Sequence, residues 1–328
     1  MTQIPKPVVV VSACLEFEQV RYDGQVIPCS LVRELEPYVE YIKVCPEVAI
    51  GLGVPRDPIR IVKIGGTKRL IQPKTKEDIT ERMNAFTTGF IEALPEVDGF
   101  IFKSKSPTIG LRGIKIYADL EAAPVIERSS GFFADQIIAA FTGYPMEDDD
   151  RLRNATIRHE FLTKLFTFAA FRQVKQEHSW EALRAFHRRN HFLFLSYDAE
   201  LTTELEAIVQ HATAGQGLDS LFEAYFTALT KLVAGHPRSE SKLHAVQQSF
   251  TRFAPQLTSA ERAFFAEVIA DYEQNRVCFL CVLDALKAYA LRFEDAYIAS
   301  QTLLEPYPKP LMVTVEPDRE RDYWKSER

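Results

Sequence analysis

Four consecutive valines, Val8–Val11, limit the fold of this chain more than any other feature. An unbroken run of β-branched apolar residues is typical of a strand buried on both faces, as in a parallel sheet covered by helices. The run continues into the small residues Ser12 and Ala13, and Cys14 follows. We therefore predict a buried parallel strand with Cys14 at its carboxyl end.

Two further segments repeat this pattern. Val39–Val44 predicts a second strand that ends at Cys45, and Gly99–Lys103 predicts a third that ends at the loop Ser104–Gly110. Between them, apolar residues spaced three or four apart predict a helix over Asp78–Leu94. Ligands of open parallel sheets bind beyond the carboxyl ends of the strands. We therefore expect both cysteines and the loop to converge on one crevice.

Composition excludes several classes of protein. The chain has 328 residues, which is enough for two domains with their own cores. Its net charge of −6 argues against a large basic surface for nucleic acid. It has no apolar stretch of the length that spans a membrane, and the residues before the valine run lack the apolar core of an export signal. We expect a cytoplasmic protein that does not contact membranes.

The sequence changes character near Met146. The acidic tract Met146–Asp150 is followed by residues with helical spacing and few strand signals. The predicted fold is an α/β N-terminal domain with a mainly parallel sheet, followed by an all-α helical bundle. The predicted domains are residues 1–145 and 146–316, with a polar tail over residues 317–328.

Five cysteines, an odd number, in a chain without an export signal favour free thiols or metal ligands over a disulfide framework. Cys14, Cys29 and Cys45 lie close together in the sequence. A cytosolic cysteine is often only a small buried apolar residue, so both interpretations stay open. Cys278 and Cys281 have apolar neighbours, and we expect them to be buried core thiols.

Several short blocks occur in a fixed order near the start of the chain. They are Ser12–Leu15, Arg21–Gly24, Cys45–Glu47, Gly51–Arg56 and Lys103–Gly110. In this order they resemble the TudS family of thiouracil desulfidase-type domains, over roughly residues 8–145. The helical part is similar to the YbgA-type domain that commonly follows such a domain. The resemblance implies a desulfidase in which three cysteines hold a [4Fe-4S] cluster, whose remaining iron takes the sulfur of a thiolated pyrimidine or related compound.

The resemblance also implies roles for individual residues. Cys14 and Cys45 match cluster ligands, and Glu47 and Ser106 match residues that assist catalysis. Glu47 would accept the proton of the attacking water. Two ordinary interpretations remain open, because Pro-Glu often begins a helix and Ser-Pro often forms a turn.

A second matched block and one arginine are candidates for substrate binding. Arg21, Tyr22 and Asp23 form a loop suited to an anionic or planar ligand, although Asp-Gly is also a turn signal. Arg56 is a second candidate for contact with an anion. Its alternative role is a structural salt bridge.

The pattern departs from the family at one ligand. The position of the family's third cysteine holds Ile109, which has no donor atom for iron. Cys29 is the obvious substitute, and we hypothesise that Cys14, Cys29 and Cys45 bind the cluster. Cluster-binding thiolates need their sulfurs within about 6 to 7 Å of one another.

The helical part departs from its family as well. A lysine expected after Phe-His is His191 here, and His187 matches a family histidine, although a lone helical histidine is usually a packing or surface residue. Two hypotheses follow. One is an iron–sulfur desulfidase whose partner is a small thiolated base or nucleoside. The other is a non-catalytic descendant without a cluster that binds a ligand or a partner. In either case the helical domain is a candidate surface for a homo-oligomer.

Overall fold

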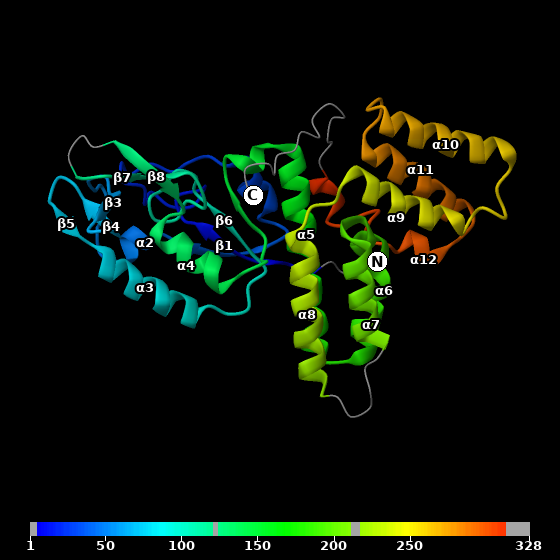
Figure 1. The fold of residues 1–328 in the computed structure, drawn as a ribbon, viewed down its shortest axis with the longest axis horizontal. Helices are drawn as coiled ribbons and strands as arrows, with labels where there is room; N and C mark the ends of the chain where they lie inside the picture. The colour runs from blue at the N-terminus through cyan, green and yellow to red at the C-terminus, as the bar shows by residue number, and fades with distance from the viewer. Residues whose placement is uncertain (1–4, 121–123, 211–216, 313–328) are drawn as a thin grey trace. The chain divides into compact units, whose positions relative to one another are not determined.

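The computed structural model describes residues 5–120, 124–210 and 217–312 of the chain (Figure 1). It divides into two compact units, an N-terminal unit, Lys6–Asn154, and a helical unit that begins at Ala155. The predicted polar tail over residues 317–328 lies outside the described residues. No described helix is both long enough and apolar enough to cross a membrane.

The valine run forms the centre of a four-stranded sheet in the N-terminal unit. The sheet contains β1 (Val8–Ser12), β2 (Glu40–Val44), β6 (Gly99–Phe102) and β9 (Met146–Asp148), in the order β2-β1-β6-β9. Every pairing in it is parallel, and the side chains of Val9–Val11 are fully buried. The prediction of a parallel sheet built from three of these strands is confirmed.

A second sheet, which the sequence analysis did not predict, extends the same unit. It contains β3 (Arg60–Ile64), β4 (Thr67–Gln72), β5 (Glu77–Asp78), β7 (Ile114–Tyr117) and β8 (Val125–Ser129), in the order β5-β4-β3-β7-β8. Only β3 and β7 pair in parallel, and the other pairings are antiparallel.

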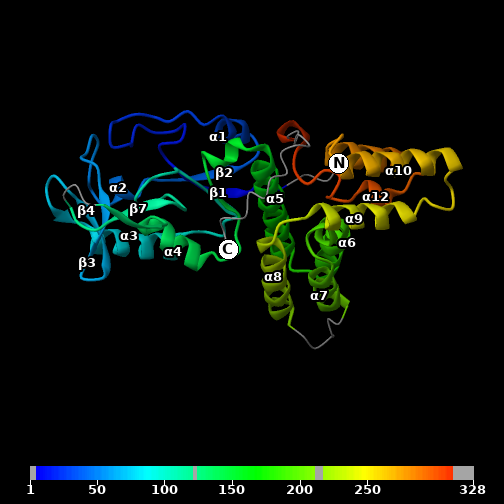
Figure 2. The ribbon, with the colours of Figure 1, turned by 45° about the horizontal axis from the view of Figure 1, so that its top comes forward.

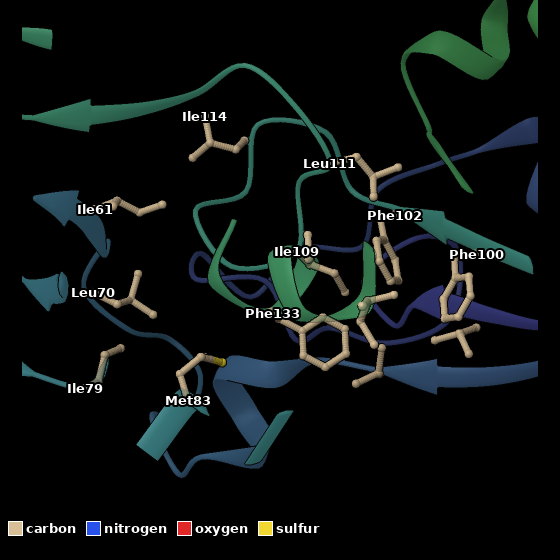
Figure 3. Packing of buried hydrophobic residues seen from close by; sticks show 14 of the residues in the cluster. Ile61, Leu70, Ile79, Met83, Phe100, Phe102, Ile109, Leu111, Ile114 and Phe133 are labelled. Carbon is tan, nitrogen blue, oxygen red and sulfur yellow. The ribbon is translucent and has the colours of Figure 1, made fainter. Parts of the chain in front are cut away.

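Among its described residues, the N-terminal unit also contains four α-helices. They are α1 (Ser30–Leu35), α2 (Pro46–Ala49), α3 (Thr80–Ala93) and α4 (Phe132–Ala140). The predicted helix is α3, which packs against α4. Buried apolar residues of both helices and both sheets form one core. Figure 3 shows Ile109 in this core beside Phe102 and Phe133.

The acidic tract belongs to the N-terminal unit, and the division between the units falls after Asn154 rather than before Met146. The tract forms β9, which pairs with β6. The side chains of Glu147, Asp148 and Asp149 are buried, and Asp150 is half-buried. Asp149 lies 2.8 Å from the Lys103 ammonium, and Glu147 accepts a hydrogen bond of 2.9 Å from Arg151. The acidic tract therefore forms an edge strand of the parallel sheet, with most of its carboxylates buried.

The helical unit follows the short 3₁₀ helix η1 (Arg151–Arg153), which ends the N-terminal unit. Its described elements are α5 (Ala155–Glu177), α6 (Trp180–Tyr197), α7 (Ala199–Gln210), α8 (Leu218–Ala234), α9 (Ser239–Thr251), α10 (Ser259–Glu273), α11 (Phe279–Arg292), α12 (Ala296–Ala299) and η2 (Lys309–Leu311). Figures 1 and 2 show α6, α7 and α8 side by side, in agreement with their mutual contacts. The predicted all-α second part is confirmed.

The cysteine pair of the helical unit differs from expectation. Cys278 precedes α11 and is half-buried, and Cys281 is exposed. Their sulfurs lie 3.6 Å apart. The prediction of two buried core thiols is wrong, because the first turn of α11 presents this pair at the surface.

The loop after β6 is fixed by the start of α4. The backbone N–H groups of Phe133 and Ala134 donate to the Thr108 carbonyl over 2.9 and 3.1 Å, and Phe132 donates to Pro107 over 3.2 Å. These groups are the N–H donors that a helix leaves unpaired at its first turn. Gly131 allows this approach, because a β-carbon there would overlap the Thr108 carbonyl.

We expect Gly131→Ala to lower the free energy of unfolding by about 1–3 kcal/mol, the usual effect of forcing an extra methyl group into a packed site. Denaturant unfolding followed by circular dichroism measures it. The matched control is Gly89→Ala, within α3, where a β-carbon meets no atom within 4 Å. The control should be stabilised by about 0.5–1 kcal/mol. Equal stability of the two variants would contradict this account of the loop.

Candidate active site

A cavity of about 470 Å³ opens beyond the carboxyl ends of β1, β2 and β6. Most of the site residues predicted from the sequence line it, namely Cys14, Cys45, Glu47, Ser106, Arg21, Tyr22 and Arg56. Asp23 and Cys29, which the structure also describes, lie outside this lining. Ile109 is part of the lining as well as of the core.

Backbone hydrogen bonds hold the three strand ends together. The Ala13 N–H donates to the Val44 carbonyl over 2.9 Å, and the Lys103 N–H donates to the Ser12 hydroxyl oxygen over 2.9 Å. Cys14 and Cys45 follow directly after these contacts. Their convergence is thus a consequence of the parallel register of the sheet.

The two thiols are buried beside a carboxylate. Burial, and secondly the charge of Glu47, raise the pKa of Cys14 to about 11 and the pKa of Cys45 to about 12. The Cys45 thiol donates to Glu47 Oε2 over 3.3 Å. Both side chains are therefore neutral thiols at pH 7, and they must release protons before they can ligate a metal.

Glu47 is held by a chain of hydroxyl groups from the loop after β6. The Thr108 hydroxyl donates to Glu47 Oε1 over 2.5 Å, and the Ser106 hydroxyl oxygen lies 2.9 Å from that of Thr108. Since Thr108 gives its proton to the carboxylate, Ser106 donates to Thr108. The backbone N–H groups of Thr108 and Ile109 each lie 3.3 Å from Ser106 Oγ. Ser106 thus shapes its turn and also belongs to the polar chain that ends at Glu47.

The sequence analysis did not identify Thr108. It is fully buried and connects Ser106 with Glu47, which lies 61 residues earlier. The only signal for it was a hydroxyl residue inside a block that had already been identified.

Arg56 joins two walls of the cavity. Its Nη1 donates to the Val20 carbonyl over 2.9 Å, and its Nη2 lies 3.8 Å from both Glu47 Oε2 and Cys45 Sγ. The side chain is 6% exposed. The structure therefore gives Arg56 a buried ion pair and a positive charge beside a thiol.

Arg21 and Tyr22 form the outer wall. The guanidinium of Arg21 lies 5.0 Å from the centre of the Tyr22 ring, and the ring is 42% exposed. Asp23 pairs with Arg21 over 3.5 Å and accepts the Gln25 N–H over 3.2 Å. Asp23 therefore supports the turn, while Arg21 and Tyr22 line the cavity.

A second charged group borders the cavity at the end of β6. Lys103 pairs with Asp149, while the Ser104 hydroxyl and the Lys105 ammonium reach Asp150 over 2.8 and 3.1 Å. Lys103, Ser104, Lys105 and Asp150 all line the cavity. The sequence analysis had assigned the acidic tract to a boundary and did not identify this group.

Cys29 caps α1 rather than lining the cavity. Its N–H donates to Glu16, and burial raises its pKa, with Asp149 adding to the increase as it does for Cys14. Ile27, two residues earlier, lines the cavity and donates its N–H to the Cys14 carbonyl over 2.8 Å. Cys29 therefore lies two residues after Ile27, whose backbone is hydrogen-bonded to that of Cys14.

Comparison with known proteins gives the same division of the chain. Residues 9–149 match the family model described as 2-thiouracil desulfurase, and residues 191–308 match DUF1722, a family of unknown function. The chain joins a 2-thiouracil desulfurase-family domain to a DUF1722 domain. Residues 9–149 of the desulfurase-family domain include every site residue predicted from the sequence.

Two individual proteins are similar to parts of the chain. The uncharacterized protein YbgA of Escherichia coli strain K12 is 25% identical over 152 residues, which is 45% of this chain and 88% of the relative. A solved structure described as the [4Fe-4S]-dependent thiouracil desulfidase TudS is 27% identical, with a TM-score of 0.36. That match covers 45% of this chain and 94% of the solved chain.

We expect Glu47→Gln to accelerate alkylation of Cys45 by iodoacetamide at pH 8 at least threefold. Removing the negative charge and the acceptor lowers the thiol pKa, and a decrease of about half a unit triples the thiolate fraction. Peptide-resolved mass spectrometry measures the rate at each cysteine.

Cys29 is the internal control, because Glu47 is not among the groups that shift its pKa. An unchanged Cys45 rate, or an equal acceleration at Cys29, would contradict the assigned contact between Cys45 and Glu47.

Proposed function

We propose that the desulfurase-family domain removes sulfur from a thiolated pyrimidine or a related small thio-compound by hydrolysis. One observation carries the proposal: Cys14, Cys45, Glu47 and Ser106, which come from three separate parts of the sequence, line a single cavity. The match of residues 9–149 to the 2-thiouracil desulfurase family supports the same reaction.

The cavity has the size and chemistry for a small planar substrate. Pockets for small molecules typically measure about 300–1,000 Å³, and this one falls within that range. The exposed ring of Tyr22 offers a flat face on which a heterocycle can stack. Arg21 and Lys105 supply donors for the carbonyl oxygens of such a ring.

In our proposal the two thiols that line the cavity are ligands of an iron–sulfur cluster. Thiolates are the usual ligands of such clusters, and Cys14 and Cys45 face one cavity. In our proposal Cys29 supplies the third thiolate. It lies two residues after Ile27, which is hydrogen-bonded to the backbone of Cys14. Arg56, 3.8 Å from Cys45 Sγ, stabilises the thiolate form. When bound, the cluster supplies a Lewis-acidic iron for the departing sulfur.

The protein's own residues handle water and protons. Hydrolysis adds one water to the C=S carbon and releases hydrogen sulfide, so that C=O replaces C=S with no net oxidation or reduction. Glu47 accepts the proton of the attacking water, which leaves the oxygen free to bond to carbon. Thr108 and Ser106 orient the carboxylate of Glu47 through their hydrogen-bonded chain.

Ile109 favours a second candidate function. It is 4% exposed and packs in the core at the position where the family has its third cysteine. A chain that has replaced a ligand by a core residue can retain the pocket as a binding site for a small thio-compound without catalysis. The next two experiments separate the candidates.

We expect the anaerobically reconstituted protein to release sulfide from 2-thiouracil and to form uracil. Glu47→Gln should lower the rate by about 100-fold or more, the usual contribution of a general base. The matched control is Glu40→Gln, an exposed carboxylate on β2, which should keep the parental rate. Sulfide electrode readings and chromatography of uracil measure the reaction. A parent without sulfide release, or an unimpaired Glu47→Gln, would overturn the proposal.

We expect about four irons per chain in the reconstituted parent and a loss of more than half of them in Cys29→Ser. Ile109→Cys should leave the iron content of the parent unchanged, because the ligand set is already complete. Iron analysis together with absorbance near 400 nm measures both variants. An iron-free parent that gains a cluster only on Ile109→Cys would favour the non-catalytic candidate.

A further inference from the structure

Two histidines and a glutamate converge in the helical unit, outside the cavity described above. His187 and His191 lie one turn apart on α6, and Glu206 lies on α7, which packs against α6. Their imidazole nitrogens and carboxylate oxygen all lie within 4.8 Å of one another. Among the described residues, this is the one such group of three His, Cys, Asp or Glu side chains.

His187 presents an unsatisfied nitrogen. Its side chain is buried, with 6% exposure, and its Nδ1 lies 3.0 Å from the hydroxyl of the fully buried Tyr225. Its Nε2 is buried and has no hydrogen-bond partner among the described residues. A buried polar atom without a partner destabilises the folded protein, so its presence points to a ligand.

The hydrogen bond to Tyr225 is compatible with the tautomer that binds metals. When Nδ1–H donates to the Tyr225 oxygen, the lone pair of Nε2 is available as a ligand. Metal-binding histidines usually donate their other ring nitrogen to a neighbouring acceptor in this way. Burial also lowers the pKa of His187 to about 4, which keeps the ring in its neutral, ligating form.

His191 and Glu206 complete the group from less buried positions. Both side chains are half-buried, and the two imidazole centres lie 6.2 Å apart. The Gln210 amide donates to Glu206 Oε1 over 2.8 Å, which leaves the lone pairs of Oε2 available to bind a metal ion. The Coulomb attraction of Glu206 opposes the decrease that burial causes in the pKa of His191.

We propose that His187, His191 and Glu206 form a site for one divalent transition-metal ion, with Zn²⁺ as the ion that best fits the ligand set. Two imidazoles and one carboxylate are a ligand set of zinc sites that keep a fourth position for water or substrate. Zinc–ligand bonds of about 2.0–2.2 Å require the donor atoms to lie about 3.3 Å apart. Rotation of His191 and Glu206 brings them to this spacing, since neither is locked in the core.

We expect the full-length protein to bind one equivalent of Zn²⁺ that is lost in His191→Gln and in Glu206→Gln, with affinity reduced by about 100-fold or more. The parent in this titration carries serine at all five cysteines, because the pair Cys278 and Cys281 and the thiols of Cys14, Cys29 and Cys45 also attract zinc. Isothermal titration calorimetry under reducing conditions measures stoichiometry and affinity.

Two further variants make the result specific. Tyr225→Phe should weaken zinc binding about 10–100-fold without removing a ligand, as loss of a supporting hydrogen bond does. His244→Gln, an exposed histidine on α9, is the matched control and should bind zinc as the parent does. Circular dichroism in the presence of a chelator checks that each variant is folded.

The outcome separates a metal site from a packing cluster. Zinc should raise the melting temperature of the parent and of His244→Gln but not that of His191→Gln. His191→Gln and Glu206→Gln decide the question even if a His187 variant fails to fold, because both residues are half-buried. Equal zinc stoichiometry and affinity in these two variants and in His244→Gln would overturn the proposal. Desulfidase activity is not a readout here, so failure of the proposed function leaves this test intact.

Discussion

Thr108 makes the contacts on which the geometry of the candidate active site depends. Its carbonyl accepts the first free N–H groups of α4, and its hydroxyl donates to the Glu47 carboxylate at the start of α2. One residue therefore fixes the loop after β6 and orients the carboxylate beside Cys45. Gly131 is required for this approach because a β-carbon would occupy the position of the Thr108 carbonyl.

The two units offer different kinds of metal ligand, thiols in one and imidazoles with a carboxylate in the other. In the desulfurase-family domain, Cys14 and Cys45 line a cavity, while Ile109, at the position where the resemblance implies a third cysteine, packs in the core. In the helical unit, a buried imidazole lacks a partner and lies beside His191 and Glu206. Soft thiolates favour iron–sulfur chemistry, and an imidazole–carboxylate set favours zinc. Each site can therefore be tested without reference to the other.

The sequence predicted the parts of the fold that depend on local pattern. The valine run and the strand before Ser104 were recognisable because burial on both faces leaves no polar positions. The strand before Cys45 carries the exposed residues Glu40 and Lys43, and its remaining apolar residues indicated it. The second sheet was missed because its strands are short and carry charged residues such as Lys63 and Lys68. The role of the acidic tract was missed because Lys103, the partner of Asp149, becomes its neighbour only through pairing of β9 with β6. Thr108 and Glu206 depend on contacts between separate elements, which local spacing does not reveal.

The most direct test of the account is the position of iron in crystals of the reconstituted protein, measured by anomalous diffraction at the iron absorption edge. The account predicts an iron–sulfur cluster in the cavity beyond β1 and β2, bonded to the sulfurs of Cys14 and Cys45 and to that of Cys29. Iron found only at Cys278 and Cys281, or no ordered iron in crystals of a protein that releases sulfide from 2-thiouracil, would contradict it.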